Sequence, residues 1–144
     1  MTPRLTLAPC AGEPELADPA FAGDWATELA KMSAAANIAP WCSYLARRDG
    51  EPVGIGGFKA SPDSAGCVEI AYLTFLPAQR QGIASTVAGE LTSIAKANGA
   101  RTACAHTLPE TNPSTRVLRA NGFTMTGEVV DPEDGPVWRW EREL

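Results

Sequence analysis

The chain has 144 residues, 44% of them hydrophobic and 20% charged, with a formal net charge of −5 and a pI of about 4.8. We predict that residues 1–144 form a single globular domain. The acidic balance argues against nucleic acid as a partner. No apolar run approaches the roughly 20 residues that a membrane-spanning helix needs. Residues 1–4 also lack the apolar core of a signal peptide, so we expect a cytoplasmic protein without membrane contact.

The first third of the chain is predicted to form a strand over residues 4–9 and then a helix. Asp18 and Pro19 suit the N-cap and first-turn positions of that helix. Large apolar residues then follow at helical spacing, and core packing explains them better than a ligand-binding role. They are Phe21, Trp25, Leu29 and Met32.

Residues 41–60 predict a β-hairpin whose strands cover residues 41–48 and 52–60, joined at Asp49-Gly50. Three glycines lie inside the second strand, where glycine is unusual, and they predict a bulge or a close backbone approach. They are Gly54, Gly56 and Gly57.

Cysteine and histidine are too sparse to predict a metal site. The four cysteines form no Cys-x-x-Cys pair, and the chain has one histidine. Free thiols in a reducing compartment are therefore expected, with three of the four in predicted strands. The cysteines are Cys10, Cys42, Cys67 and Cys104.

The central feature of the chain is a strand, a turn and a helix over residues 68–98. Residues 68–75 are almost all apolar or aromatic, which predicts a strand covered on both faces. A helical pattern follows and ends at Asn98-Gly99. Its apolar face is formed by Ile83, Val87, Leu91 and Ile94.

The turn between this strand and helix, residues 79–84, could hold a phosphate group. A helix start leaves backbone N–H groups without partners, and Gly82 lets an anion approach the main chain. Arg80 adds a positive charge. On these six residues alone, a tight turn with no ligand is the simpler interpretation.

The C-terminal part is predicted to hold a strand over residues 101–107, a helix over residues 112–121 and a final hairpin of strands 123–130 and 137–142. The strand, helix and strand around residues 68–107 should form a parallel βαβ unit. We therefore expect an α+β domain with a mixed, mostly antiparallel central sheet flanked by helices.

Two tryptophans, Trp138 and Trp140, lie on one face of the last predicted strand. They fit a place in the core better than an interface. An exposed pair would instead indicate a homodimer.

The motif Gln79-x-x-Gly82-x-Ala84, directly after the central strand, resembles motif A of the GNAT acetyltransferases. A second segment, Asn112-Pro113-Ser114 followed by Gly122-Phe123, is similar to the ribosomal-protein N-acetyltransferase-like branch of that family. The resemblance implies the GNAT fold and acetyl-CoA as the acyl donor. It also implies direct attack of an amine on the thioester in a ternary complex.

The same resemblance implies which residues bind the coenzyme. The end of the central strand would pair with the pantetheine arm, the turn amides would bind the pyrophosphate, and Asn112 would contact the CoA arm. The implied residues are Leu73, Thr74, Phe75, Gln79, Arg80, Gln81, Gly82, Ile83, Ala84, Ser85, Asn112 and Ser114. Asn112 and Ser114 could also serve as helix N-caps, and the two roles are compatible.

Proton transfer has two candidates. Glu69 is the only charge in its predicted buried strand and resembles the catalytic base of the histone acetyltransferase branch. Alternatively, it is a structural carboxylate bonded to Arg47 or Tyr44. His106, at the end of the fifth predicted strand, is either a base or shuttle or a structural residue. Leu118 stands where many family members have a tyrosine, which leaves a dedicated general acid in doubt.

The function predicted from these features is N-acetyl transfer to a small-molecule amine or a protein N-terminus. The acidic surface is compatible with a cationic acceptor. Two alternatives stay open: transfer of another acyl group, and a CoA-binding module with little turnover. Nucleotide binding through the same turn is disfavoured, because the chain has no Gly-Lys-Ser/Thr and no Gly-x-Gly-x-x-Gly motif.

Overall fold

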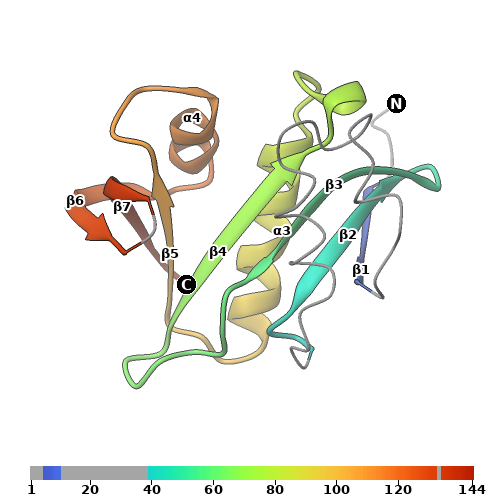
Figure 1. Ribbon diagram of the computed structural model, residues 1–144. Coiled ribbons are helices and arrows are strands. Elements are labelled where there is room, and N and C mark those ends of the chain that lie inside the picture. Colours follow the sequence, from blue (N-terminus) through green and yellow to red (C-terminus); the bar gives the residue numbers. More distant parts are fainter. Residues whose placement is uncertain (1–4, 11–38, 133) are drawn as a thin grey trace.

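The computed structural model describes residues 5–10, 39–132 and 134–144, which form a seven-stranded sheet in the order β1-β2-β3-β4-β5-β7-β6 (Figure 1). All neighbouring strands are antiparallel except β4 and β5. This confirms the predicted mixed, mostly antiparallel sheet. The strands are β1 (Leu5–Pro9), β2 (Ser43–Arg48), β3 (Glu51–Phe58), β4 (Cys67–Thr74), β5 (Thr102–Thr107), β6 (Thr124–Asp131) and β7 (Gly135–Glu143).

Two helices and one short 3-10 turn accompany the sheet in the described residues. They are α3 (Ile83–Ala97), α4 (Pro113–Ala120) and η3 (Leu76–Ala78). Both helices agree with the sequence prediction, whereas η3 was not anticipated. The helix predicted from Asp18 onward, with its apolar residues up to Met32, lies outside the described residues.

Strand β4 is covered completely on one face only. Val68 and Ile70 are buried, whereas the other residues of β4, among them Glu69 and Ala71 on the opposite face, are half-buried. The expectation of a strand covered on both faces was therefore wrong. The physical reason is that α3 packs on β3 and β4 from one side, and the other face lines a hollow described below.

Glycine in β3 lets α3 approach the sheet closely. A Cβ atom on Gly56 would lie 2.6 Å from Cγ1 of Val87 and 3.1 Å from Cδ1 of Leu91. The β2–β3 ladder also shifts register between Ala46 and Arg47. The predicted close backbone approach and the predicted bulge are both present.

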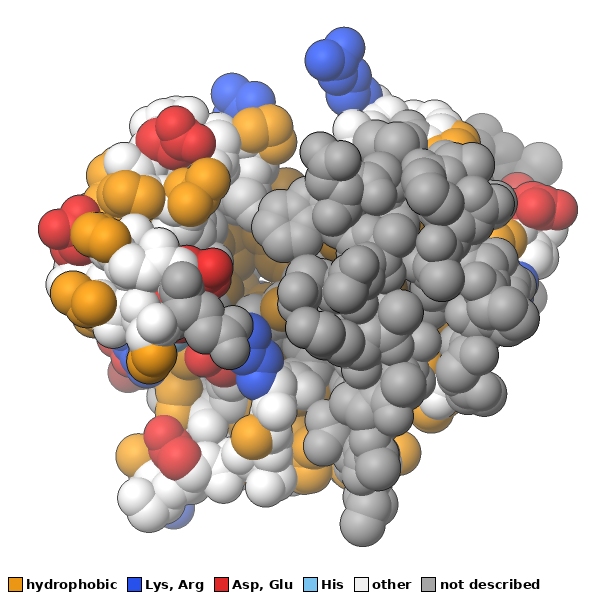
Figure 2. All heavy atoms as spheres, in the orientation of Figure 1, with side chains coloured by type: hydrophobic (Ala, Val, Ile, Leu, Met, Phe, Trp, Pro, Cys, Tyr) orange, Lys and Arg blue, Asp and Glu red, His pale blue; other side chains and the backbone are white. Residues whose placement is uncertain are grey.

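Two tryptophans of β7 belong to the hydrophobic core. Trp140 is 1% exposed, and its Nε1 donates a hydrogen bond to Oγ1 of Thr107 at 3.0 Å. Trp138 is half-buried and packs against the same cluster, so the tryptophans belong to the core as predicted. Figure 2 shows apolar side chains on the surface over β6 and β7. Among the described residues, the large hydrophobic side chains that are exposed are Leu108, just after β5, and Met125, Val129 and Val130 in β6.

All four cysteines are free thiols, and two of them lie in the parallel strand pair. Cys67 and Cys104 belong to β4 and β5, whereas Cys42 lies one residue before β2, not inside a strand. Burial, together with the neighbouring Cys67 thiol, raises the pKa of Cys104 to about 12. The Cys104 thiol is therefore protonated, and unreactive as a nucleophile, at neutral pH.

The parallel pair β4–β5 is short. Residues are paired at three positions only, Cys67 with Thr102, Val68 with Ala103 and Glu69 with Cys104. Beyond that point β5 continues on β7 alone, up to Thr107 opposite Trp138. Figure 1 shows the two strands diverging from their common base, with α4 beside the wide end. The sheet is thus opened between its two halves.

Replacing Gly56 by alanine is expected to lower the free energy of unfolding by about 1–3 kcal/mol, because the new methyl group would overlap Val87 and Leu91. Urea denaturation measures this change. Ser93→Ala, at an exposed position of the same helix, is the control and should stay within about 0.5 kcal/mol of the unchanged chain. Equal denaturation midpoints for G56A and the unchanged chain would contradict the close packing of α3 on β3.

Candidate active site

A cavity of about 100 Å³ lies where β4 and β5 separate, bounded on one side by α4. It is lined by Lys59, Glu69, Ile70, Ala71, Tyr72, Ala105, His106, Ser114 and Leu118. A larger depression of about 590 Å³ lies over the ends of β5, β6 and β7 and holds none of the sequence-predicted site residues. We place the site in the smaller cavity, since it contains both predicted proton-transfer candidates.

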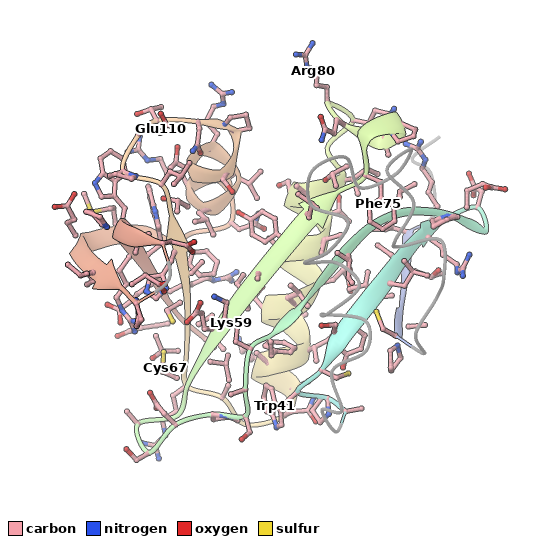
Figure 3. The ribbon with its side chains drawn as sticks, viewed as in Figure 1. Trp41, Lys59, Cys67, Phe75, Arg80 and Glu110 are labelled. Carbon is pink, nitrogen blue, oxygen red and sulfur yellow. The ribbon has the colours of Figure 1, made fainter. Side chains whose placement is uncertain are left out.

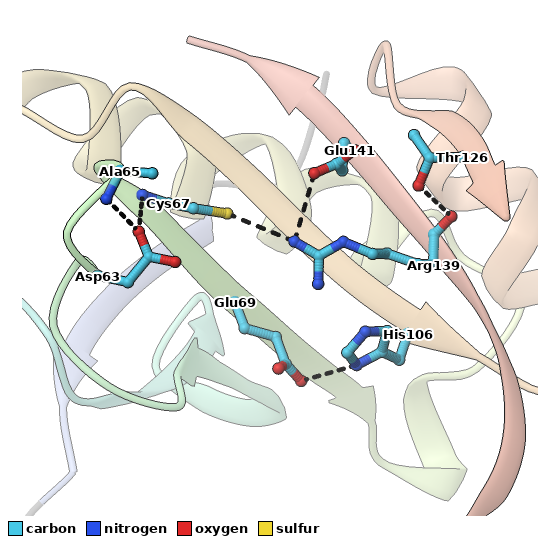
Figure 4. A network of polar contacts seen from close by, with 8 residues as sticks. All are labelled: Asp63, Ala65, Cys67, Glu69, His106, Thr126, Arg139 and Glu141. Carbon is cyan, nitrogen blue, oxygen red and sulfur yellow. Dashed lines mark hydrogen bonds and ion pairs between the residues drawn. The ribbon is translucent and has the colours of Figure 1, made fainter. Parts of the chain in front are cut away.

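Glu69 and His106 lie together at the closed end of this cavity. Oε2 of Glu69 is 3.4 Å from Nδ1 of His106 (Figure 4). The same oxygen is 2.8 Å from Nζ of Lys59. Glu69 comes from β4, His106 from β5, and Lys59 follows β3 directly. The contact between the two candidates follows from the register, because Glu69 stands opposite Cys104 and β5 then carries His106 two residues further along the same face.

Lys59 was not anticipated as a site residue. Its N–H donates to the carbonyl of Glu69 at 3.0 Å, so the two residues face each other at the end of the β3–β4 ladder. No local sequence signal identified this pair, because it depends on the register of β3 on β4. The structural partners suggested for Glu69 were wrong, because Tyr44 donates to the Pro40 carbonyl and Arg47 to the Gly50 carbonyl.

The imidazole of His106 has no hydrogen-bond partner within the described residues, although both ring nitrogens are buried. Nδ1 is close enough to Glu69 for an ion pair, but the two groups are not aligned for a hydrogen bond. Buried polar groups without partners are rare, and they often mark functional positions.

Negative charge surrounds Lys59. Partial burial lowers the pKa of Lys59, but the hydrogen bond and charge of Glu69, with the charges of Asp131 and Asp134, outweigh burial and raise it. The amine is therefore protonated at neutral pH. The ammonium is thus stabilised by carboxylates from β4, from the end of β6 and from Asp134.

The turn before α3 presents an open helix start. Gly82 occupies the N-cap position with φ of 77°, and no side chain caps the helix. No atom outside its chain neighbours lies within 4 Å of the position where a Cβ on Gly82 would stand. The first amides of α3 are consequently not covered by a side-chain cap, which is the arrangement expected for an anion site.

The three residues before Gly82 are all exposed. Gln79 donates to the carbonyl of Thr74 at 3.3 Å, and Gln81 accepts from the Arg48 guanidinium. These contacts brace the turn against β4 and β2. Arg80, with a left-handed φ of 65°, points away from the fold in Figure 3. Arg80 is exposed two residues before Gly82, the N-cap of α3, so its positive charge lies close to this helix end in sequence.

The other residues of the β4 end and the start of α3 that were implied in coenzyme binding are buried in the core or half-buried, and none of them lines the cavity. Phe75 is 1% exposed and its N–H donates to the carbonyl of Val53, so its side chain belongs to the core. Ile83 is also buried, whereas Leu73, Thr74 and Ala84 are half-buried. Ser85 accepts a hydrogen bond from the Asn121 side chain at 3.2 Å, which ties the first turn of α3 to the end of α4.

Helix α4 is capped by its own residues, in contrast to α3. The Asn112 side chain accepts from the Thr115 N–H at 3.0 Å, and Thr115 Oγ1 accepts from the Asn112 N–H at 3.1 Å. This confirms Asn112 as an N-cap, and its contact with a coenzyme stays a prediction. The Ser114 carbonyl accepts from the hydroxyl of Tyr72 at 3.2 Å across the cavity.

Two large side chains close the cavity next to α4. Burial raises the pKa of Tyr72, so its hydroxyl stays protonated at neutral pH. Leu118 is completely buried and offers no hydroxyl at the position where many GNAT members carry a tyrosine.

Among the described residues, no three histidine, cysteine or acidic side chains are grouped so that they could hold a metal ion. In the same part of the chain, no helix is long and apolar enough to cross a membrane.

A family model described as the acetyltransferase (GNAT) domain matches residues 6–124. The match covers most of the chain and includes the open turn, the diverging strands and α4. The protein therefore belongs to the GNAT family of acetyltransferases. No curated protein matches the chain.

Solved structures share the fold. RimL, a ribosomal alpha-N-protein acetyltransferase solved with coenzyme A, matches with a TM-score of 0.65 and 24% identity over 72% of this chain and 62% of RimL. The chain thus spans less than two thirds of RimL. An aminoglycoside acetyltransferase, also solved with coenzyme A, matches with a TM-score of 0.75 and 17% identity. The match covers 97% of this chain and 95% of the aminoglycoside acetyltransferase. A GNAT acetyltransferase from Streptococcus pneumoniae matches with a TM-score of 0.65 and 14% identity. The match covers 98% of this chain and 100% of the other protein.

Replacing Asn112 by alanine is expected to lower the free energy of unfolding by about 1 kcal/mol, because the Thr115 N–H loses its acceptor. Asn112→Ser keeps a side-chain oxygen at the N-cap and should leave stability nearly unchanged. Thermal denaturation of the two variants separates these outcomes. Equal losses in both variants would contradict the capping role of Asn112.

Proposed function

We propose that the protein transfers the acetyl group of acetyl-CoA to the nitrogen of an amine. The observation that carries this proposal is the separation of β4 from β5 directly after Glu69, beside an uncapped helix start. A thioester entering this opening would reach the one cavity in which Glu69 and His106 meet. Family membership supports acetyl transfer, and transfer of another acyl group remains an alternative.

The coenzyme would lie along the edge of β4. Its diphosphate would accept hydrogen bonds from the amides at Gly82 and the first turn of α3, with Arg80 adding charge. Its pantetheine arm would pair with residues 70–74 of β4, which face β5 without a ladder partner on it. The thioester then arrives at the closed end of the cavity. Coenzyme A in RimL and in the aminoglycoside acetyltransferase supports this ligand class.

The reaction needs a deprotonated amine held against the thioester carbonyl. In our proposal Glu69 takes the proton, with His106 beside it as a shuttle, and the nitrogen attacks the carbonyl carbon. The C–N bond forms, the C–S bond breaks, and the thiolate takes up a proton as it leaves. Holding both reactants in one cavity can account for several kcal/mol of the barrier.

The acceptor is proposed to be a small-molecule amine or a protein N-terminus. RimL is a protein N-acetyltransferase, and the second structure is an aminoglycoside acetyltransferase. Both classes of acceptor carry amines. We also propose that residues 1–144 work as one domain in the cytoplasm. The exposed Val129 and Val130 on β6 would suit a homodimer contact.

Replacing Ala84 by aspartate is expected to weaken acetyl-CoA binding about tenfold or more, since the new carboxylate would repel the diphosphate. Folding should not suffer, because negative charge suits a helix N-terminus. Calorimetric titration with acetyl-CoA measures the affinity. Ser93→Asp, with the same charge change in a later turn of α3, is the control. An undiminished affinity in A84D would argue against a diphosphate at this turn.

Glu69→Gln is expected to lower kcat about 100-fold or more while the KM for acetyl-CoA changes little, because the amide cannot accept the proton. Thiol release with a panel of primary amines measures turnover. Glu90→Gln, on the exposed side of α3, makes the same chemical change away from the cavity and should keep full activity. Unchanged turnover in E69Q would exclude Glu69 from proton transfer. Tight binding of acetyl-CoA by the unchanged chain, without turnover, would instead favour the CoA-binding module.

A further inference from the structure

Lys59 places a primary amine at the closed end of the cavity. Its Nζ lies 2.8 Å from Oε2 of Glu69, the carboxylate proposed to take the proton from the acceptor. An external amine would need the same position, within about 3 Å of that oxygen. Figure 3 shows the Lys59 side chain directed toward the space between β4 and β5. Its side chain is 55% exposed, so it has room to move.

The rest of the cavity leads a thioester to the same place. A coenzyme arm that follows β4 from Thr74 toward Ile70 runs toward the point where β5 closes the opening. Glu69 is the next residue of β4, and Lys59 stands opposite Glu69 on the β3 side. The base and a tethered amine are therefore both adjacent to the expected position of the acetyl carbonyl.

We infer that Lys59 is an acceptor itself, and that the enzyme acetylates its own Lys59 side chain. The inference rests on the proposed function, because it uses the same donor and the same base. The Lys59 ammonium gives a proton to Glu69, and the free amine attacks the thioester carbonyl. An amide bond forms, the C–S bond breaks, and coenzyme A leaves as a thiolate that takes up a proton. Acetyl-CoA is the only other reactant.

The charges around Lys59 give this reaction a pH dependence and a consequence. Glu69 contacts the ammonium directly, with His106 next to Glu69, and the charges of Asp131 at the end of β6 and of Asp134 also favour its charged form. Because only the neutral amine attacks, acetylation should accelerate as the pH rises. Once acetylated, Lys59 no longer neutralises these carboxylates, and the cavity then favours a cationic external acceptor.

The chain provides an internal control. Its three lysines are Lys31, Lys59 and Lys96. Lys96 is exposed in the last turn of α3, roughly 20 Å along the helix from Gly82. It reports the background reaction of a lysine with acetyl-CoA on the same molecule. Lys31 lies outside the described residues.

The test is incubation of the purified chain with acetyl-CoA, followed over time by peptide mass spectrometry. We expect acetylation of Lys59 to be about tenfold or more faster than that of Lys96, because a tethered amine has a high effective concentration. The first-order rate constant should not depend on protein concentration. Glu69→Gln should slow the reaction at Lys59 but not at Lys96, whereas Glu90→Gln should slow neither. Lys59→Arg keeps the positive charge and should abolish the modification.

Four results would overturn the inference. Equal acetylation of Lys59 and Lys96, in the native chain as in urea, would mean background chemistry. A rate constant that grows with protein concentration would mean transfer between molecules. An unmodified Lys59 in a chain that binds acetyl-CoA by calorimetry would remove self-acetylation alone. Absence of saturable acetyl-CoA binding would overturn the proposed function together with it.

Discussion

The loss of pairing between β4 and β5 is the constraint on which the site depends. Main-chain groups of β4 beyond Glu69 cannot be satisfied by β5, because that strand continues on β7 instead. Unpaired backbone groups in a sheet interior are costly unless a ligand or water takes them. The unpaired edge of β4 lowers the stability of the sheet, but it can pair with an extended ligand. This edge begins directly after Glu69.

The two helices that border the opening begin in opposite ways. Helix α4 satisfies its first amides internally through Asn112 and Thr115, whereas α3 begins at Gly82 without a side-chain cap. Only the second arrangement leaves amides for an anion. The hydrogen bonds that the Asn121 side chain donates to Ser85 tie the first turn of α3 to the end of α4.

One end of the cavity pairs the carboxylate of Glu69, the proposed base, with the ammonium of Lys59. Lys59 stabilises the Glu69 carboxylate in the empty site, which avoids an uncompensated half-buried charge. An acceptor ammonium can replace Lys59 there without a net change of charge. The charges of Asp131 and Asp134 add to the negative field around Lys59, in keeping with a cationic acceptor.

The sequence by itself determined the elements and the family. Local signals such as Asn112 before Pro113, Gly82 before Ile83 and the helical spacing of apolar residues in α3 depend on neighbours a few residues apart. These signals located the open turn, α4 and the parallel unit correctly. Local signals also singled out Glu69, as the only charge in its predicted strand, and His106, as the lone histidine at a strand end, and their catalytic roles stay predictions.

Only the tertiary structure decided how these residues meet. The contact of Lys59 with Glu69 depends on the register of β3 on β4, and the pair of Glu69 with His106 on the register of β4 and β5. Neither register can be deduced from the spacing of residues within one strand. A shift of one residue between two strands would move each side chain to the other face. The same holds for β4, whose apolar sequence suggested two covered faces although α3 covers one.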